Sequence, residues 1–424
     1  MAFLGNNNAA LAAQREAITP IMPELMLTSS YLWGAMDALD GVMPVGTRPT
    51  RIPTLPQIGA NPSVPNFDGG PLGRGQAPQE VPAYASCASY LLSIEWTLLS
   101  DWATDSDAKA IKSFSALTHE MAPKAFGSFM DVMAQNDGSN VIDTIVTVNA
   151  GSLTVNQANY FQAGQYVDIF TATNGTFVTT LQVADENPNG GNIISTTTAI
   201  PGTVLAGMAI AVHGSTATSN SGMLGLHYFN TLSATGNYLG IQRASYPSRY
   251  VANGVALNNQ GLTQSVVRAM QVAGAYSIGG KFADSKKVIH CGPDGVAAWE
   301  ANYTGVITAT RDSAGKRSLD MLPEDPPQYM AGLPILGPDK WGNPRATPGR
   351  IDVIDLAVYK RLETKAMGEL EWGGQTDFPI VAGDGGLAAS TISYMGVITQ
   401  MICLNVRQQG VITGYQIGKG ILGH

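Results

Sequence analysis

Apolar residues recur every three or four positions through residues 104–134, which is the spacing of one buried face of an α-helix. The residues of this stripe are Ile111, Phe114, Leu117, Met121, Ala125, Phe129 and Val132. Residues 104–107 (TDSD) supply an N-cap and an acidic first turn, so we expect the helix to begin there. Pro123 lies within the stripe and has no N–H to donate. We therefore expect it to kink the helix or to split it in two.

In residues 140–216 the pattern changes, because apolar and polar positions alternate in short runs. One face of such a run carries Phe177, Thr179, Leu181 and Val183. Asn174-Gly175 separates two of these runs, and this dipeptide favours a two-residue hairpin turn because both residues accept a positive φ. The segment therefore predicts a small antiparallel β-sandwich or barrel.

Helical and strand patterns alternate in the second half of the chain. Residues 262–276 form an amphipathic helix pattern, residues 286–292 (KKVIHCG) a buried strand, and Pro293-Asp294 suit the start of a further helix. Strand-like runs follow in residues 334–360. Residues 391–406 (TISYMGVITQMICLNV) are apolar enough, and long enough, for one extended strand. This order predicts an α/β layer and a separate long strand.

Prolines are too frequent in residues 44–85 for a central strand or a helix. A disordered linker is one interpretation. Apolar residues nevertheless recur throughout the segment: Ile52, Leu55, Ile58, Val64, Phe67 and Leu72. Because a solvated linker does not need them, we predict a long protruding hairpin or loop that docks on a neighbouring molecule. Residues 1–43 before it have the character of an extended arm.

Charged residues make up 13% of the chain, against roughly a quarter in a typical soluble protein. Such a low content indicates an obligate assembly that hides surface against neighbours, with a β-rich secreted domain as the alternative. The formal net charge is −8, and no Lys or Arg occurs between Ala125 and Gln242. Nucleic-acid binders carry a basic patch, so we do not expect this protein to bind DNA tightly.

Cys87, Cys291 and Cys403 are far apart and lie in mostly apolar runs, which predicts buried free thiols of a reducing cytoplasm. The first residues lack the pattern of a signal peptide, so we expect none. No stretch of about 18 uninterrupted apolar residues occurs, so no membrane span is expected.

Motifs for catalysis are weak in this sequence. His119-Glu120 begins a metalloprotease-like pattern, but Pro123 follows and no second histidine does. Ser277 follows a predicted helix rather than a strand, unlike a nucleophile elbow, and the glycine-rich residues 383–388 precede a β pattern rather than the helix of a dinucleotide site. Asp185 and Glu186 are more typical of water-facing turn residues than of a cation site. We therefore predict no enzyme, with no catalytic residue, cofactor or metal.

The order of these parts resembles the HK97-like fold of tailed-phage major capsid proteins. The segments that carry the resemblance are residues 73–84 (GRGQAPQEVPAY), 93–99 (SIEWTLL) and 235–254 (TGNYLGIQRASYPSRYVANG). The resemblance implies an α+β chain with these parts: N-terminal arm 1–43, extended loop and return strand 44–100, peripheral domain with a spine helix 101–139, inserted β-sandwich or barrel 140–216, continued peripheral domain 217–250, axial α/β domain 251–372, and a return to the peripheral domain 373–424.

The resemblance also implies a function. The chain is expected to assemble with itself into hexamers and pentamers of an icosahedral virion head, which encloses double-stranded DNA without sequence-specific binding and assembles in the host bacterial cytoplasm. Portal, scaffolding and decoration proteins are the implied partners, and a separate scaffold is expected because the arm begins almost at Met1. A β-rich tail or baseplate protein and an encapsulin-type shell protein are the alternatives.

Two further expectations concern contacts between subunits. Some members of this family join their subunits by a bond from a lysine of the extended loop, but this chain has no lysine before Lys109, so we expect no such cross-link. Arginines of the loop can instead pair with carboxylates of a neighbour. The candidate contact residues are Arg48, Arg51, Phe67, Arg74 and Glu80.

Overall fold

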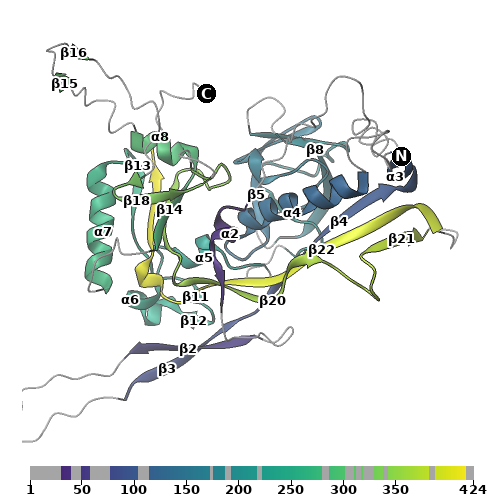
Figure 1. The fold of residues 1–424 in the computed structure, drawn as a ribbon. Coiled ribbons are helices and arrows are strands. Elements are labelled where there is room, and N and C mark those ends of the chain that lie inside the picture. Colours follow the sequence, from purple (N-terminus) through teal and green to yellow (C-terminus); the bar gives the residue numbers. More distant parts are fainter. Residues whose placement is uncertain are drawn as a thin grey trace, which may run out of the picture.

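Three β-sheet units and one projecting hairpin make up the described structure (Figure 1). The computed structural model describes residues 30–39, 49–57, 77–103, 114–171, 175–186, 192–216, 222–278, 286–300, 310–311, 317–318, 329–337, 342–381 and 387–416. No helix among these residues is long and apolar enough to cross a membrane.

A 17-residue strand, β22 (Leu387–Cys403), forms the axis of the first unit. Strand β4 (Ala88–Thr97) pairs antiparallel along one edge, and β20 (Tyr359–Glu369) and β21 (Asp377–Val381) pair antiparallel along the other. The two-residue β1 (Asp37–Ala38) adds a parallel pairing to β20. The predicted extended strand at 391–406 is thus confirmed as the centre of this long sheet.

Helix α4 (Phe114–Met133) packs against the long sheet, after a short helix, α3 (Leu98–Ala103). Pro123 was expected to kink the helix or to split it in two, and the split does not occur, because α4 runs through Pro123 as one element. A proline inside a helix costs about 3 kcal/mol. Burial of Phe126, Met130 and Met133 contributes roughly 1.5–3 kcal/mol for each side chain and outweighs that cost. The expected start at 104–107 lies outside the described residues.

Six antiparallel strands form a closed barrel between α4 and the next part of the chain. They are β5 (Val141–Asn149), β6 (Ser152–Val155), β7 (Tyr166–Phe170), β8 (Phe177–Glu186), β9 (Ile193–Thr196) and β10 (Ala209–Val212). In β8, Leu181 and Val183 are buried, as the period-two pattern predicted, whereas Phe177 of the same predicted face is 52% exposed. Of the Asn174-Gly175 turn, Asn174 lies outside the described residues; β7 and β8 pair on either side of it.

A six-stranded mixed sheet forms the third unit, with α7 (Gln264–Ile278) and α8 (Pro293–Glu300) packed on it. Its strands, in spatial order, are β13 (Asn253–Gln260), β23 (Gly410–Tyr415), β19 (Arg350–Asp355), β14 (Lys287–Cys291), β18 (Leu333–Leu336) and β17 (Tyr329–Met330). Its core is a separate apolar cluster that includes Met270, Ile289, Trp299, Val353 and Ile412. The helix–strand–helix order predicted for 262–303 is therefore present in the described part.

The expected axial boundary at residue 372 does not match the strand pairing. Strand β20 belongs to the long sheet, whereas β23, expected in the peripheral part, lies between β13 and β19 of the mixed sheet. The physical reason is a turn at residues 356–358, which separates β19 from β20. Leu356 and Val358 at this turn pack against the core, so the apolar pattern continues without a visible break.

Strands β2 (Thr50–Gln57) and β3 (Gln79–Ala85) form a two-stranded antiparallel hairpin that projects away from the sheets (Figure 1). The protruding hairpin predicted in 44–85 is confirmed for these strands, and residues 58–76 lie outside the described part. The remaining short elements are α2 (Leu32–Ala35), α5 (Leu226–Phe229), β11 (Asn237–Tyr238), β12 (Ile241–Gln242), α6 (Pro247–Tyr250), β15 (Thr310–Arg311) and β16 (Arg317–Ser318), with 3₁₀ turns at Ala158–Tyr160, Arg243–Ser245 and Val406–Gln408.

Candidate functional site

Histidine and carboxylate side chains are not gathered into a metal site in the part of the chain that is described. His119 of α4 instead lies between two strands of the long sheet. Its Nδ1 is 2.8 Å from Glu369 Oε1, its Nε2 is 3.6 Å from Asp377 Oδ1, and its ring edge meets Trp96. These contacts tie α4 to β20 and β21. Asp185, at the end of β8, is exposed.

The other sequence motifs also have structural surroundings. Ser277 lies within α7 and its hydroxyl accepts a hydrogen bond from Arg407 Nε at 3.0 Å. Strand β22, not a helix, begins directly after the glycine-rich residues 383–386, which lie outside the described part. All three cysteines are free, two of them buried, and burial raises the pKa of the Cys403 thiol to about 12. A thiol in that state is a poor nucleophile.

The residues predicted for subunit contacts divide into two groups. Arg48, Phe67 and Arg74 lie outside the described residues. Arg51 of β2 and Glu80 of β3 pair with each other across the hairpin, with 3.0 Å between Arg51 Nη2 and Glu80 Oε1. Both side chains are exposed, so the pair contributes at most about 1 kcal/mol and leaves their outer surfaces open.

One face of the hairpin is open to solvent and carries apolar residues beside the Arg51–Glu80 pair. Tyr84 lies opposite Arg51 in the register, and Tyr84 and Leu55 are each about half exposed. Pro53 is exposed on the same strand as Leu55. An isolated two-stranded ribbon is marginally stable in water. The apolar residues on a projecting ribbon therefore mark a surface suited to contact with another molecule.

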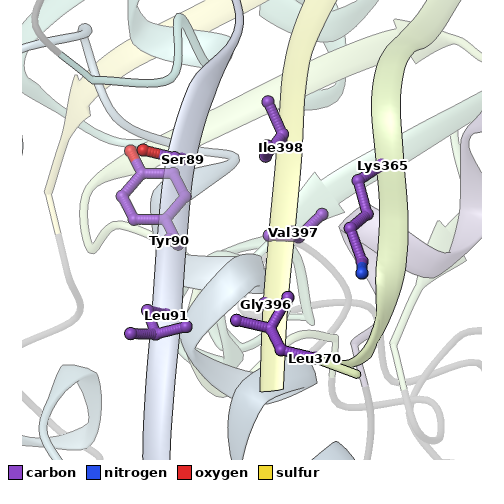
Figure 2. A pocket seen from close by; sticks show the side chains of 8 residues that line it. All are labelled: Ser89, Tyr90, Leu91, Lys365, Leu370, Gly396, Val397 and Ile398. Atoms are coloured by element: carbon purple, nitrogen blue, oxygen red, sulfur yellow. The ribbon is translucent and has the colours of Figure 1, made fainter. Parts of the chain in front are cut away.

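A groove opens on the face of the long sheet that includes Leu91 and Ile398 (Figure 2). Its volume is about 270 Å³, and its lining residues are Ser89, Tyr90, Leu91, Lys365, Leu370, Gly396, Val397 and Ile398. Leu91 is 57% exposed, an unusual state for a leucine in a strand that pairs along its whole length. Leu91, Leu370 and Ile398 give the groove an apolar wall, and Lys365 adds one cation.

Gly396 forms the floor of this groove. A Cβ at this position would lie 3.3 Å from Leu370 Cδ2 and 3.5 Å from Leu91 Cδ1, so any side chain here would fill the space between these two leucines. Gly368 of β20 lies directly opposite Gly396 in the register. A glycine inside a strand often marks the close approach of another backbone. This site was not among the sequence-based predictions, and the only signal for it in the sequence is the glycine within the predicted strand.

A buried polar junction surrounds the C-terminal end of α4. Asp131 Oδ1 accepts hydrogen bonds from the backbone N–H groups of Leu32 (2.6 Å) and Trp33 (2.9 Å), and its Oδ2 accepts one from Asn343 Nδ2 (2.8 Å). Gln135, two residues after the end of α4, donates to the carbonyl of Arg345 and accepts from the N–H of Thr347. The junction therefore joins two distant parts of the chain, residues 32–33 and 343–347, to the end of one helix.

The buried His227 lies beside this junction, with 3.0 Å between its Nε2 and Thr347 Oγ1, and it predicts a stability that depends on pH. Burial lowers the pKa of His227 to about 3, against an unfolded value of about 6.5. As pH falls below about 6.5 only the unfolded chain takes up this proton, so stability decreases by roughly 1.4 kcal/mol per pH unit until about pH 3. Urea unfolding at pH 7, 6 and 5 measures the slope. In His227→Gln the unfolded chain takes up about one proton fewer than in the parent, so stability should depend less steeply on pH. An unchanged slope would show that His227 is not the group responsible.

Together the long sheet with its helix, the mixed α/β sheet and the projecting hairpin define the HK97-like capsid fold. The chain aligns with a chain of the capsid asymmetric unit of cyanophage A-1(L) with a TM-score of 0.56 and 14% identity, covering 95% of this chain and 97% of that one. A chain from the capsid of a native GTA particle aligns with a TM-score of 0.48 and 10% identity, over 94% of each chain.

The SrpI encapsulin of Synechococcus elongatus PCC 7942 aligns with a TM-score of 0.46 and 8% identity, over 95% of this chain and 93% of that one. No protein-family model and no curated protein matches the sequence. The likeness to the cyanophage A-1(L) chain, at 14% identity, shows the fold.

Proposed function

We propose that this chain is the major capsid protein of a tailed bacteriophage or prophage and has no catalytic role. The observation that carries the proposal is the alignment with the cyanophage A-1(L) capsid chain over nearly the full length of both chains. The low content of charged residues supports it, because subunits of a closed shell bury much of their surface.

Subunits assemble into hexamers and pentamers of an icosahedral head, and the open face of the β2–β3 hairpin docks on a neighbouring subunit. The groove around Gly396 is the receiving surface, because its leucine walls complement the exposed Leu55 and Tyr84. Each such contact is weak, but a closed lattice multiplies it. Arg51 and Glu80 lie beside these apolar residues, and Arg48, Phe67 and Arg74 complete the contact set.

The head encloses double-stranded DNA without gripping it. The net charge of −8 offers no basic patch, and the barrel has no lysine or arginine in residues 141–212. We therefore place the barrel, an insertion in the peripheral domain, on the outer side of the shell, where it adds contacts or receives a decoration protein. Scaffolding and portal proteins are the other partners, and assembly takes place in the host cytoplasm before the protein enters the virion.

Assembly of the purified full chain tests this function. Negative-stain electron microscopy and light scattering should show closed shells, tubes, or five- and six-fold rings, alone or after co-expression with neighbouring genes as scaffolds. Particles from producing cells should contain nuclease-resistant DNA rather than a protein cargo, which separates a virion head from an encapsulin-type shell. A discrete oligomer that never closes under any of these conditions would contradict the proposal.

A further inference from the structure

The projecting hairpin is bonded on both of its strands to one segment, residues 228–250. In Figure 1 the elements of this segment, β11, β12 and α6, lie directly against β2 and β3. Four hydrogen bonds join the two parts: Tyr84 N–H to the carbonyl of Leu239 (2.9 Å), Tyr246 Oη to Gln79 Oε1 (3.2 Å), Arg249 Nε to the carbonyl of Pro56 (3.1 Å), and Tyr250 Oη to Thr54 Oγ1 (3.1 Å). We call residues 228–250 the socket.

Arg243 lies at the centre of the socket and is only 2% exposed. Its guanidinium donates to the carbonyl oxygens of Tyr250 and Tyr228, the latter at 2.5 Å. It also lies over the rings of Tyr228 and Tyr238, with 5.2 and 5.9 Å to the ring centroids. Among the described residues no carboxylate lies within 4.0 Å of it, so the buried cation is held by carbonyl dipoles and aromatic faces.

Tyr250 connects this buried centre to the hairpin. Its backbone carbonyl accepts from Arg243, its ring stacks on Tyr238 with centroids 4.5 Å apart and planes 17° apart, and its hydroxyl contacts Thr54 of β2. A planar guanidinium has several donors in a fixed geometry, and a lysine ammonium cannot reproduce them. The backbone position of Tyr250, and with it the place of its hydroxyl against Thr54 of β2, therefore depends on Arg243.

We propose that Arg243 is a positioning residue, which acts through Tyr228 and Tyr250 to fix the direction in which the β2–β3 hairpin leaves the subunit. The contacts of the socket reach from Tyr84 near the base of the hairpin to Pro56 and Gln79 at the outer end of its strands. A displacement of the socket therefore moves the described strands as a whole. If the hairpin docks on a neighbour, as the proposed function holds, the socket also sets the angle between subunits.

Pulsed electron–electron double resonance measures the distance between two spin labels and tests the socket directly. The full chain is kept unassembled at low concentration. One spin label replaces the exposed Leu55 of β2 and the other the exposed Val272 of α7, in a chain with Cys87→Ser. The labelled parent should give one narrow distance distribution. Tyr250→Phe, which removes only the hydroxyl that contacts Thr54, and Arg243→Lys should each broaden it at least twofold. The matched control is Tyr276→Phe, because Tyr276 is 85% exposed on α7.

Thermal unfolding of the same variants distinguishes positioning from general destabilisation. Tyr250→Phe should broaden the distribution while it leaves the melting temperature within a few degrees of the parent. A distribution as narrow as that of the parent overturns the inference, and Tyr250→Phe decides the question alone if Arg243→Lys does not fold. In assembly, Tyr250→Phe should give particles of mixed diameter.

These experiments distinguish failure of the proposed capsid function from failure of the proposed role of Arg243. A broadened distribution in a chain that never forms shells contradicts the capsid function but supports the socket. Shells with unchanged distance distributions in both variants support the capsid function but overturn the socket.

Discussion

Asp131→Ala is expected to lower the free energy of unfolding by about 3 kcal/mol or more. The substitution leaves the N–H groups of Leu32 and Trp33 and the amide of Asn343 buried without their acceptor, and each unsatisfied buried group costs roughly 1–3 kcal/mol. Urea unfolding at pH 7 measures the difference. Asp185→Ala, an exposed carboxylate at the end of β8, is the control and should change stability by less than about 0.5 kcal/mol.

The loss should be largest where the first described segment meets α4. Asp131 caps the N-terminus of α2, and Trp33 in that helix packs against Arg361 of β20, with 4.9 Å from the guanidinium carbon to the ring centroid. Hydrogen exchange at residues 32–38 should therefore accelerate more in Asp131→Ala than exchange in the barrel strands. Equal acceleration everywhere, or a loss of stability below about 1 kcal/mol, would show that the junction does not depend on this carboxylate.

Elements with a strong local pattern could be predicted from the sequence. Burial of one face of a helix or strand sets the spacing of its apolar residues, and the sequence shows that spacing directly. Examples are the extended strand at 391–406, the alternating run at 177–183 and the helix–strand–helix order after 262. The hairpin in 44–85 could be predicted for a related reason. Its prolines exclude a central strand, yet its apolar residues require a partner surface.

Features that depend on contacts between distant residues could not be predicted. Asp131 is 99 residues from Leu32 and 212 from Asn343, and nothing in its local sequence shows that it is a buried cap. Arg243 looks like an ordinary surface cation in its polar segment, yet it is buried because aromatic residues on both sides fold around it. The continuity of α4 through Pro123 likewise depends on burial of the helix's apolar side chains against the rest of the fold, and local helix propensity gives no information about that burial.

Gly396→Val is expected to reduce shell assembly at least tenfold while the subunit stays folded. Valine favours strands, and the Cβ at this position meets only the flexible ends of Leu370 and Leu91, so the long sheet should tolerate it. The new side chain fills the groove that receives a neighbour's hairpin in the proposed shell. A tenfold loss corresponds to about 1.4 kcal/mol, which is no more than the burial of one apolar side chain contributes.

The matched control is Gly368→Ala on the opposite strand. It adds a side chain in the same row of the sheet, but its Cβ meets nothing nearer than the Ala366 carbonyl oxygen at 4.0 Å, so the groove stays open. Light scattering during assembly, with the melting temperature of each subunit, compares the two variants. Normal assembly of Gly396→Val would exclude the groove as the docking surface. Loss of assembly in both variants would instead show that this row of the sheet needs its glycines for backbone reasons.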